Sequence, residues 1–588
     1  MDRSGTLLKR KNRTVISGRF ATMLSAAVLT VFFSCILSII DTIIAGITIG
    51  EDGVSGVTLI SPLTTFIAFI GYTISSGTSL FSGFKQGQGD DSEADEIFST
   101  GLITGIASAI IVTLCLILLK GMIFDDPVNN FGDFKTEALQ YYTGLYLYPT
   151  ALYLNLMMYG FAMAFGRDRM CLHTGILSAV LNIILSVLLA GHYGCYGISI
   201  GTSISLFAGT LFYIINLLTH KINLKLKLCF SYRKFKRIIF VGINDSLDML
   251  ALGLLPFAVS AYLIRNFGPE HYIIFTVVLN GLNLVSAFLT GLSDTMEALL
   301  MLYFGEKNYH ALKEIFTISL RTVIVFSTLA SLMLFVFAEP FAQLLGINDP
   351  GNLGSAVQAL RIFSPFLIVI SVEYIYLCHY SCIRHEIYSY ILLALLFLIA
   401  PSFLIYLLGH TYRMIGVWWG MGLSSIICMM INIVCVLIMN RRLGLGKAGR
   451  TLLPQSELER QLYYNCPADV SDIVATVERA ADDMKSHALP DNRSARIQLL
   501  MEEMGLQAIE RNASGSKTAR PVYLQYTIMP GEPTVLIIRD NGILANDTDD
   551  AENLTKASLH SYVLAQAASG SSTEYKPTTE RNRTKFYI

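Results

Sequence analysis

Long apolar runs recur along this chain as far as about residue 440, and short polar segments separate them. A helix of about 20 residues, rising 1.5 Å per residue, spans a hydrocarbon core of roughly 30 Å. We therefore interpret the runs as about twelve transmembrane helices. They cover residues 20–30, 57–80, 99–121, 141–164, 171–190, 197–218, 238–264, 271–300, 313–338, 362–382, 387–408 and 414–439.

Basic residues are distributed unevenly among the segments that separate these runs. Lys and Arg collect before residue 15, in residues 220–238 and after Arg441, whereas residues 50–53 and 124–134 contain none. By the positive-inside rule, the N-terminus, the central loop and everything after Arg441 are cytoplasmic, which requires an even number of spans. The sequence therefore predicts a multi-pass protein of the plasma (inner) membrane with both ends in the cytoplasm.

The composition supports a membrane protein and argues against several other classes. Of 588 residues, 53% are hydrophobic and only 15% are charged, which is too apolar for a soluble domain. The net charge of −1 gives no support to a nucleic-acid partner. The ten Cys are scattered without zinc-binding spacing, so we expect no metal site and no required cofactor.

The membrane part repeats itself at an offset of about 218 residues. GQGDDSEADEIF at 87–98 and GEKNYHALKEIF at 305–316 share Gly and Glu-Ile-Phe at equal spacing. The repeat predicts two six-helix lobes, which cover residues 16–218 and 238–445. Parallel repeats of this kind place a substrate cavity at their interface and suit alternating access. Further matching pairs are Pro149 with Pro365, Arg167 with Arg384, Gly197 with Gly416 and Gly201 with Gly420.

Two shorter segments complete the organisation of the membrane part. Residues 1–15 form a cytoplasmic N-terminal tail, and residues 219–237 form a basic linker between the lobes. The linker alternates polar and apolar residues, which is typical of a segment lying against anionic lipid headgroups. A plain cytoplasmic tether is the alternative, since the positive-inside rule already explains its charge.

Asp41 is the single charge in an apolar stretch that runs from residue 20 to residue 50. A carboxylate inside a membrane helix costs several kcal/mol, so it usually faces a protein interior or a wet cavity and handles ions or protons. We interpret Asp41 as such a site. The alternative is a hydrated carboxylate near the outer end of the helix.

Other polar residues lie within the predicted spans. Asn182 and Glu373 are both mid-span, whereas Asp245 and Asp248 occupy one face near the start of the seventh span. Glu373 is interpreted as functional because of its depth. Hydration explains the Asp pair equally well, and Asn182 can instead join helices by hydrogen bonding.

Residues 15–445 resemble the multidrug and toxic compound extrusion (MATE) family of transporters. The matching pieces include IIDTIIAGITIG, SGTSLFSGFKQGQGDDSEA, AFGRDRM and LNIILS, in this order within a twelve-span repeat. The resemblance implies a membrane all-α fold and an antiporter that works by alternating access. It would export small organic compounds in exchange for Na⁺ or H⁺ as the coupling ion.

The resemblance also assigns residues to the coupling site. Asp41 matches the first-helix carboxylate that binds the cation in prokaryotic members, Asn182 a fifth-helix Asn and Thr202 a sixth-helix Thr. Ser186 stands where many members carry a second Asp, so this lobe retains one carboxylate. Other branches of the family use acidic residues on the seventh and tenth helices, where this chain has Asp245, Asp248 and Glu373.

The composition changes after Arg450, and residues 446–588 contain no spanning run. About 130 residues suffice for one soluble domain. The mixture of amphipathic and alternating segments predicts an α+β fold. We predict strands at 458–465, 522–529, 534–540 and 583–588, with helices at 469–487, 491–512 and 557–568.

This tail resembles the histidine-kinase-like ATPase fold, an α+β sandwich, and most closely the anti-sigma-factor serine-kinase type. Glu503 matches the acidic residue that activates water or a hydroxyl, and Gln507 replaces the Mg²⁺-binding Asn. Asp540 matches the reader of the adenine amino group, and Gly542 the Gly beside the base. The glycine-rich phosphate lid is not recognisable in residues 558–570. ATP with Mg²⁺ is a candidate ligand, but we interpret the domain as a degenerate module that binds a cytoplasmic protein partner or binds nucleotide only weakly. Regulatory nucleotide binding and an active ATPase or kinase are the alternatives.

Three functions are compatible with these observations. The first is a cation-coupled exporter with a cytoplasmic regulatory domain, which is a transporter and not an enzyme. The second is a lipid-linked saccharide flippase, which favours a cationic cavity, yet intramembrane Lys and Arg are nearly absent. The third is a membrane-anchored anti-sigma-like serine kinase or sensor, which needs intact nucleotide motifs.

Overall fold

The computed structural model describes residues 14–124, 135–219, 229–345, 347, 350–443, 451–513, 522–542, 567–568, 570–576 and 581–588. The chain divides into two compact units. The membrane unit consists of residues 24–306 and 316–439. The tail unit consists of the residues up to 23, residues 307–315 and the chain from 440 onward.

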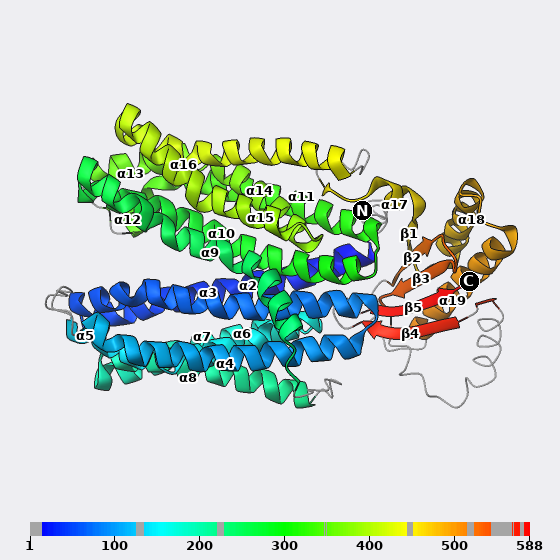
Figure 1. The fold of residues 1–588 in the computed structure, drawn as a ribbon, viewed down its shortest axis with the longest axis horizontal. Coiled ribbons are helices and arrows are strands. Elements are labelled where there is room, and N and C mark those ends of the chain that lie inside the picture. Colours follow the sequence, from blue (N-terminus) through cyan, green and yellow to red (C-terminus); the bar gives the residue numbers. More distant parts are fainter. Residues whose placement is uncertain are drawn as a thin grey trace, which may run out of the picture. The chain divides into compact units, whose positions relative to one another are not determined.

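The helices of the first lobe follow the predicted apolar runs (Figure 1). Their lipid-facing sides carry strongly exposed apolar residues, such as Leu118 (77% exposed) and Leu218 (75%), as expected for helices surrounded by lipid tails. The helices are α2 (Val15–Thr48), α3 (Glu51–Gln88), α4 (Asp91–Phe124), α5 (Lys135–Gly144), α6 (Tyr148–Ala164), α7 (Asp168–Tyr193) and α8 (Cys195–Thr219).

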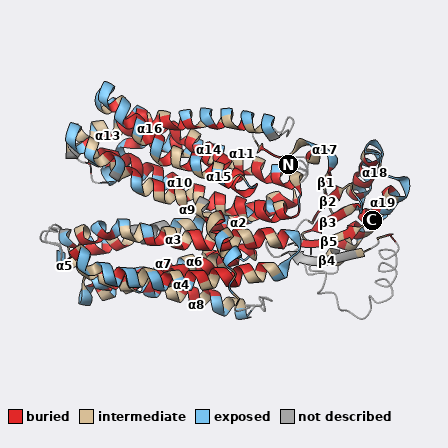
Figure 2. Ribbon diagram, viewed as in Figure 1, coloured by how far each residue is buried: buried red, intermediate tan, exposed pale blue. Residues whose placement is uncertain are grey.

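The second lobe repeats this helical pattern, and buried residues gather where its helices face one another (Figure 2). Its first helix begins at Tyr232, so the last residues of the predicted linker 219–237 belong to this helix. The elements are α9 (Tyr232–Phe267), α10 (Pro269–Gly305), α11 (Tyr309–Val336), α12 (Ala338–Leu344), α13 (Pro350–Phe363), α14 (Phe366–Cys382), α15 (Glu386–Ala394), η2 (Leu395–Ile399) and α16 (Ala400–Leu443).

Each of the twelve predicted runs lies in helical structure, but several are broken or fused. In the described part of the chain, nine helices are long and apolar enough to cross a bilayer, or ten if the bent pair α13–α14 counts as one span. The run 141–164 is divided between α5 and α6. The last two runs are joined across a kink at Arg413, where φ is 56°.

The lobes meet where α3 packs against the start of α9. A Cβ atom at Gly77 would overlap the carbonyl oxygen of Ile238, and one at Gly242 would overlap the carbonyl of Thr73. Small residues allow two backbones to approach this closely in a membrane protein. Thr73 and Ser246 add a buried hydrogen bond of 2.6 Å between their hydroxyls. This contact lies at the end of the lobes that the charge distribution predicts to be cytoplasmic.

The tail contains an antiparallel five-stranded sheet in the order β1-β2-β3-β5-β4. Helices α18 and α19 pack on one face, where Tyr526, Ile538 and Met501 belong to the core. The elements are α17 (Gln455–Arg460), β1 (Leu462–Pro467), α18 (Val470–Ser486), α19 (Asp491–Ala513), β2 (Tyr523–Met529), β3 (Val535–Asp540), β4 (Gly570–Lys576) and β5 (Arg581–Tyr587).

Two predictions for the tail need correction. The predicted strand 458–465 begins only at Leu462, because Gln455–Arg460 form a short helix. Strand β4 was not predicted, since its sequence GSSTEYK lacks apolar alternation and pairs only with β5. The predicted helix 557–568 lies almost wholly outside the described residues.

The contact between α3 and α9 predicts that alanine substitutions at two glycines will have different effects on the melting temperature. Gly242→Ala should lower the melting temperature of the purified protein, because separating two packed backbones costs about 1–3 kcal/mol. Gly83→Ala is the matched control on α3, where a Cβ meets nothing within 4 Å, and it should be neutral or slightly stabilising. Equal melting temperatures for the two variants would contradict the proposed packing.

Candidate functional site

A buried polar cluster lies inside the first lobe and is centred on Asp41. The Asp41 side chain on α2 is only 5% exposed. Thr202 on α8 donates from its hydroxyl, which lies 3.0 Å from both carboxylate oxygens. Tyr141 on α5 donates to Oδ2 at 3.1 Å. Three helices therefore supply the carboxylate and its hydrogen-bond donors.

Asn182 extends this cluster from α7. Its Nδ2 donates to the Thr202 hydroxyl at 2.8 Å, which leaves that hydroxyl free to donate toward Asp41. The Asn182 side chain is fully buried, and its Oδ1 has no hydrogen-bond partner among the described residues. A buried amide oxygen without a partner is costly and calls for an explanation.

Close packing of α7 and α8 sets the position of Thr202. A Cβ atom at Gly201 would lie within 3 Å of the Ser186 hydroxyl and backbone nitrogen. Ser186 in turn donates to the carbonyl of Ile198 at 3.3 Å. Ser186 therefore serves helix packing here, and Asp41 is the single carboxylate of the cluster within the described residues.

The cluster offers oxygen atoms of the type that hard cations prefer. Both Asp41 oxygens, the hydroxyls of Thr202 and Tyr141, and the partnerless Oδ1 of Asn182 can contribute. The orphaned Oδ1 fits the oxygen set of a cation site. A proton on the Asp41 carboxyl would change the local charge by the same single unit.

The sequence indicated Asp41, Asn182 and Thr202 but not Tyr141. Tyr141 is one of several tyrosines in residues 141–148, and nothing in that stretch distinguishes it. Its role depends on α5 ending beside α2, a contact between residues 100 positions apart. A phenol in an otherwise apolar run was the only available signal.

A second buried carboxylate lies in the other lobe. Glu373 on α14 is 1% exposed and accepts a 2.7 Å hydrogen bond from Asn432 on α16. Tyr388 on α15 donates to the side-chain Oδ1 of Asn432 at 2.6 Å. Neither Asn432 nor Tyr388 was predicted, because only the fold brings these three helices together.

Asp248 on α9 has partners of its own. It is 8% exposed, and Tyr374 donates to its Oδ2 at 3.1 Å. Its Oδ1 accepts from the backbone nitrogen of Met249. The backbone of Asp245 lies in α9, and its side chain is outside the described residues. The predicted grouping of Asp245 with Asp248 therefore stays a prediction.

In the tail, both carboxylate oxygens of Asp540 already accept hydrogen bonds from other residues of the same domain. Arg511 on α19 pairs with its Oδ2 at 2.9 Å. Its Oδ1 accepts from Asn582 at 2.9 Å and from the backbone nitrogen of Gly542 at 3.0 Å. An adenine amino group would have to displace at least one of these internal donors.

The other predicted nucleotide residues have similar local roles. Gln507 lies one turn after Glu503 on α19, and the weak contact between their side chains is 3.5 Å long. A Cβ atom at Gly542 would overlap the end of the Asn512 side chain, so this glycine packs closely against α19. Residues 543–566, which include most of the expected lid, lie outside the described residues.

Comparison with known proteins supports the membrane assignment. The MatE family model matches residues 26–188 and 247–400. The chain is similar to a solved MATE in complex with MaL6, at 18% identity, covering 75% of this chain and 99% of that one with a TM-score of 0.68. It is also similar to a MOP superfamily transporter from Pyrococcus furiosus Vc1, which is described as having a binding pocket of reverse polarity. The two share 19% identity over 73% of this chain and 96% of that one, with a TM-score of 0.64.

A third similar structure is the outward-facing conformation of a multidrug resistance MATE transporter, at 18% identity, 71% and 94% coverage and a TM-score of 0.65. Identities this low establish the fold only. No curated protein matches this chain. The family model covers more than half of the residues, and the fold agrees over the same region. The chain therefore belongs to the MatE family of membrane transporters.

Proposed function

We propose that this protein is an antiporter of the plasma membrane that exports small organic compounds by alternating access, coupled to H⁺ or Na⁺ at Asp41. The observation that carries the proposal is the buried cluster of Asp41, Thr202 and Tyr141 beside the partnerless oxygen of Asn182. A carboxylate held this way inside an apolar lobe is a functional group by default.

The hydrogen bonds suggest how the cluster responds to an ion. Without a bound cation, Thr202 and Tyr141 donate to the Asp41 carboxylate. A cation beside Asp41 would take oxygens as ligands, and the Asn182 amide is already oriented by its bond to Thr202. Binding or release changes the buried charge by one unit. That change is large enough to favour a different arrangement of the surrounding helices.

Alternating access requires the two lobes to separate at one end at a time. The glycine contacts between α3 and α9 support a state closed at the predicted cytoplasmic end. Glu373 and Asp248 are further candidates for ion binding in the second lobe, since both are buried and accept hydrogen bonds from neighbouring helices.

We further propose that the tail is a cytoplasmic regulatory domain and not an ATPase or kinase. The Asp540 carboxylate, which a nucleotide would need for its adenine, already accepts hydrogen bonds from Arg511, Asn582 and the backbone nitrogen of Gly542. The domain then acts through protein contacts, either with this chain or with a cytoplasmic partner.

Replacing the Asp41 carboxylate tests the coupling site. Asp41→Asn should abolish uptake of a cationic dye into inside-out vesicles, because the amide can neither titrate nor bring a charge to a cation. Asp90→Asn is the control, since Asp90 is an exposed helix cap and Asn caps equally well. Wild-type uptake by Asp41→Asn, at equal expression, would disprove coupling through this residue.

The hydroxyl of Thr202 provides a second test. Thr202→Val should weaken the apparent affinity for the coupling ion by about 10-fold or more, because a hydrogen bond to a charged group is worth roughly 1.5–3 kcal/mol. Thr202→Ser retains the hydroxyl and should stay near the wild type. The measurement is transport rate against ion concentration, and coincident curves for the two variants would exclude Thr202 from the site.

Nucleotide binding by the full-length protein tests the assignment of the tail. We expect no saturable binding of a fluorescent ATP analogue with millimolar Mg²⁺ and no ATP hydrolysis above that of the Asp540→Asn variant. Saturable, Mg²⁺-dependent binding that Asp540→Asn removes would instead establish an adenine site.

A further inference from the structure

The tail sheet has two buried faces, and only one of them is covered by α18 and α19. The opposite face presents Gln525 and Thr527 (both 0% exposed) and Arg539 (1%). The register places these residues together, because Gln525 pairs with Arg539 and Thr527 pairs with Tyr463. A buried polar face needs hydrogen-bonding partners. Within the tail unit, residues 307–315 at the start of α11 supply them.

A chain of donors crosses this face and ends on α11. Arg539 donates to the side-chain Oε1 of Gln525 at 3.0 Å, and the Gln525 Nε2 donates to the Tyr463 hydroxyl at 2.6 Å. Tyr463 donates to Glu314 Oε2 at 2.7 Å. The chain therefore runs from a guanidinium to a carboxylate, an arrangement in which each bond polarises and strengthens the next.

The turn before α11 makes further contacts with the same face and its edge. Gln461 donates to the carbonyl of Lys307 at 2.7 Å and accepts from the backbone nitrogen of Tyr309 at 3.1 Å. Asn308, which is fully buried, donates to Thr527 at 3.2 Å. The ring of His310 stacks on that of Tyr463, with centroids 5.6 Å apart.

The equivalent turn of the first repeat requires no such support. There the left-handed position is Gly89 with φ of 83°, whereas the second repeat has Lys307 with φ of 58°. Both turns are followed by the same cap, since Asp90 accepts from the nitrogen of Glu93 and Asn308 accepts from that of Ala311. A side chain in this conformation is strained, and the hydrogen bonds from Gln461 stabilise it.

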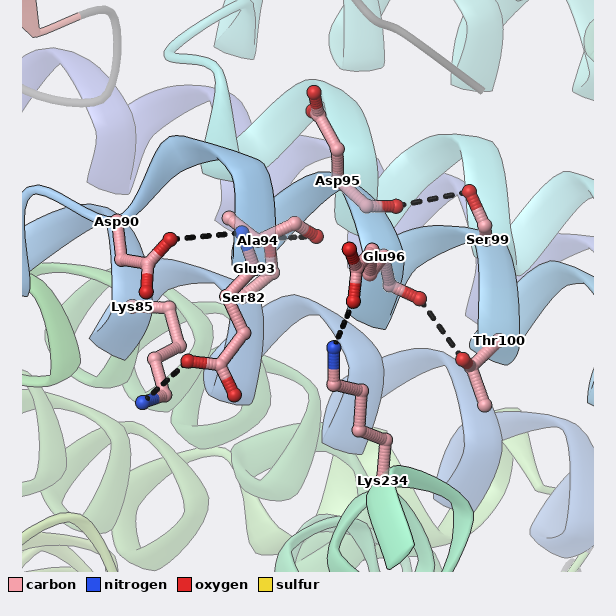
Figure 3. A network of polar contacts seen from close by, with 10 residues as sticks. All are labelled: Ser82, Lys85, Asp90, Glu93, Ala94, Asp95, Glu96, Ser99, Thr100 and Lys234. Atoms are coloured by element: carbon pink, nitrogen blue, oxygen red, sulfur yellow. Dashed lines mark hydrogen bonds and ion pairs between the residues drawn. The ribbon is translucent and has the colours of Figure 1, made fainter. Parts of the chain in front are cut away.

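The repeat also relates two carboxylates, Glu96 and Glu314. Glu96 on α4 pairs with Lys234 on α9 at 2.5 Å (Figure 3), which joins the first lobe to the first helix of the second. Glu314 on α11 accepts from Thr14 just before α2, and so joins the second lobe to the first helix of the first. In this second contact, Tyr463 of the tail binds the other oxygen of the same carboxylate.

We propose that the outer face of the tail sheet is an intramolecular latch, with the start of α11 as its partner. Docking reinforces the link of Glu314 to Thr14 and so favours closure of the predicted cytoplasmic end. Because α11 is continuous from Tyr309 to Val336, fixing its first turns restrains the whole helix. When the tail sheet undocks from α11, the fraction of transporters that are open to the cytoplasm then rises. The inference rests on alternating access as proposed above.

Amide hydrogen exchange of the full-length protein, in nanodiscs without substrate or ion gradient, tests the latch. Tyr463→Phe removes the hydroxyl but retains the ring. It should accelerate exchange at least about five-fold in residues 305–316, the factor expected for one net hydrogen bond. Exchange should also rise in residues 232–246 of α9, which lose protection when the closed end opens.

The matched control is Tyr526→Phe, which removes a hydroxyl from the opposite face of the same sheet, where it donates to the carbonyl of Met501. This variant should leave both segments unchanged. Exchange in residues 523–529 verifies that the tail is still folded in Tyr463→Phe. Gln461→Ala provides a second variant on the same turn, with the same expected result in residues 305–316.

Unchanged exchange in residues 305–316 for both Tyr463→Phe and Gln461→Ala would overturn the latch. Faster exchange there without any change in residues 232–246 would overturn its link to closure. The coupling site is tested separately, by transport: wild-type transport by Asp41→Asn would refute it without bearing on exchange in residues 305–316, so a failure of the coupling site and a failure of the latch give different results.

Discussion

A carboxylate buried among apolar helices must find hydrogen-bond donors inside the protein, and this constraint organises the first lobe. Asp41 finds its donors on α5 and α8, and Asn182 on α7 holds the Thr202 hydroxyl in place. Four helices are thereby tied to one charge. Any change of that charge alters the bonds that hold them, which is the physical basis for coupling an ion to a movement of the lobe.

The same constraint explains the tail, where the buried polar face of the sheet would be unstable alone. Gln525 and Arg539 are satisfied through Tyr463, and the chain of donors ends on Glu314. The internal pairing of Asp540 with Arg511 means that its carboxylate serves the fold. Because Asp540, the residue that we predicted to contact adenine, is engaged internally, and because the outer face of the sheet binds the turn before α11, the domain is suited to sensing that turn.

Local patterns in the sequence were sufficient for the spans, the repeat and the mixed α/β character of the tail. Asp41 and Asn182 could be singled out because a polar residue in a long apolar run is conspicuous, whereas Thr202 was indicated only by the resemblance to the MATE family. Tyr141 and Asn432 could not, since their partners lie on helices that only the fold brings near. The hydrogen bond from Gln461 to the carbonyl of Lys307 joins residues 154 positions apart, so no local sequence pattern indicates it. Helix α9 begins at Tyr232, ahead of the predicted span 238–264, because the Lys and Arg residues between 233 and 237 are good helix formers and extend the helix beyond the apolar run.

We propose that Asp41 alone carries the exchangeable charge of the first lobe. Infrared difference spectroscopy of the full-length protein in lipid, recorded on stepping the pH or adding Na⁺, tests it most directly. The account predicts a buried carboxyl band that changes with the ion and is absent from the Asp41→Asn spectrum. A band of undiminished size in that variant would show that another carboxylate responds to the ion, and would contradict the account.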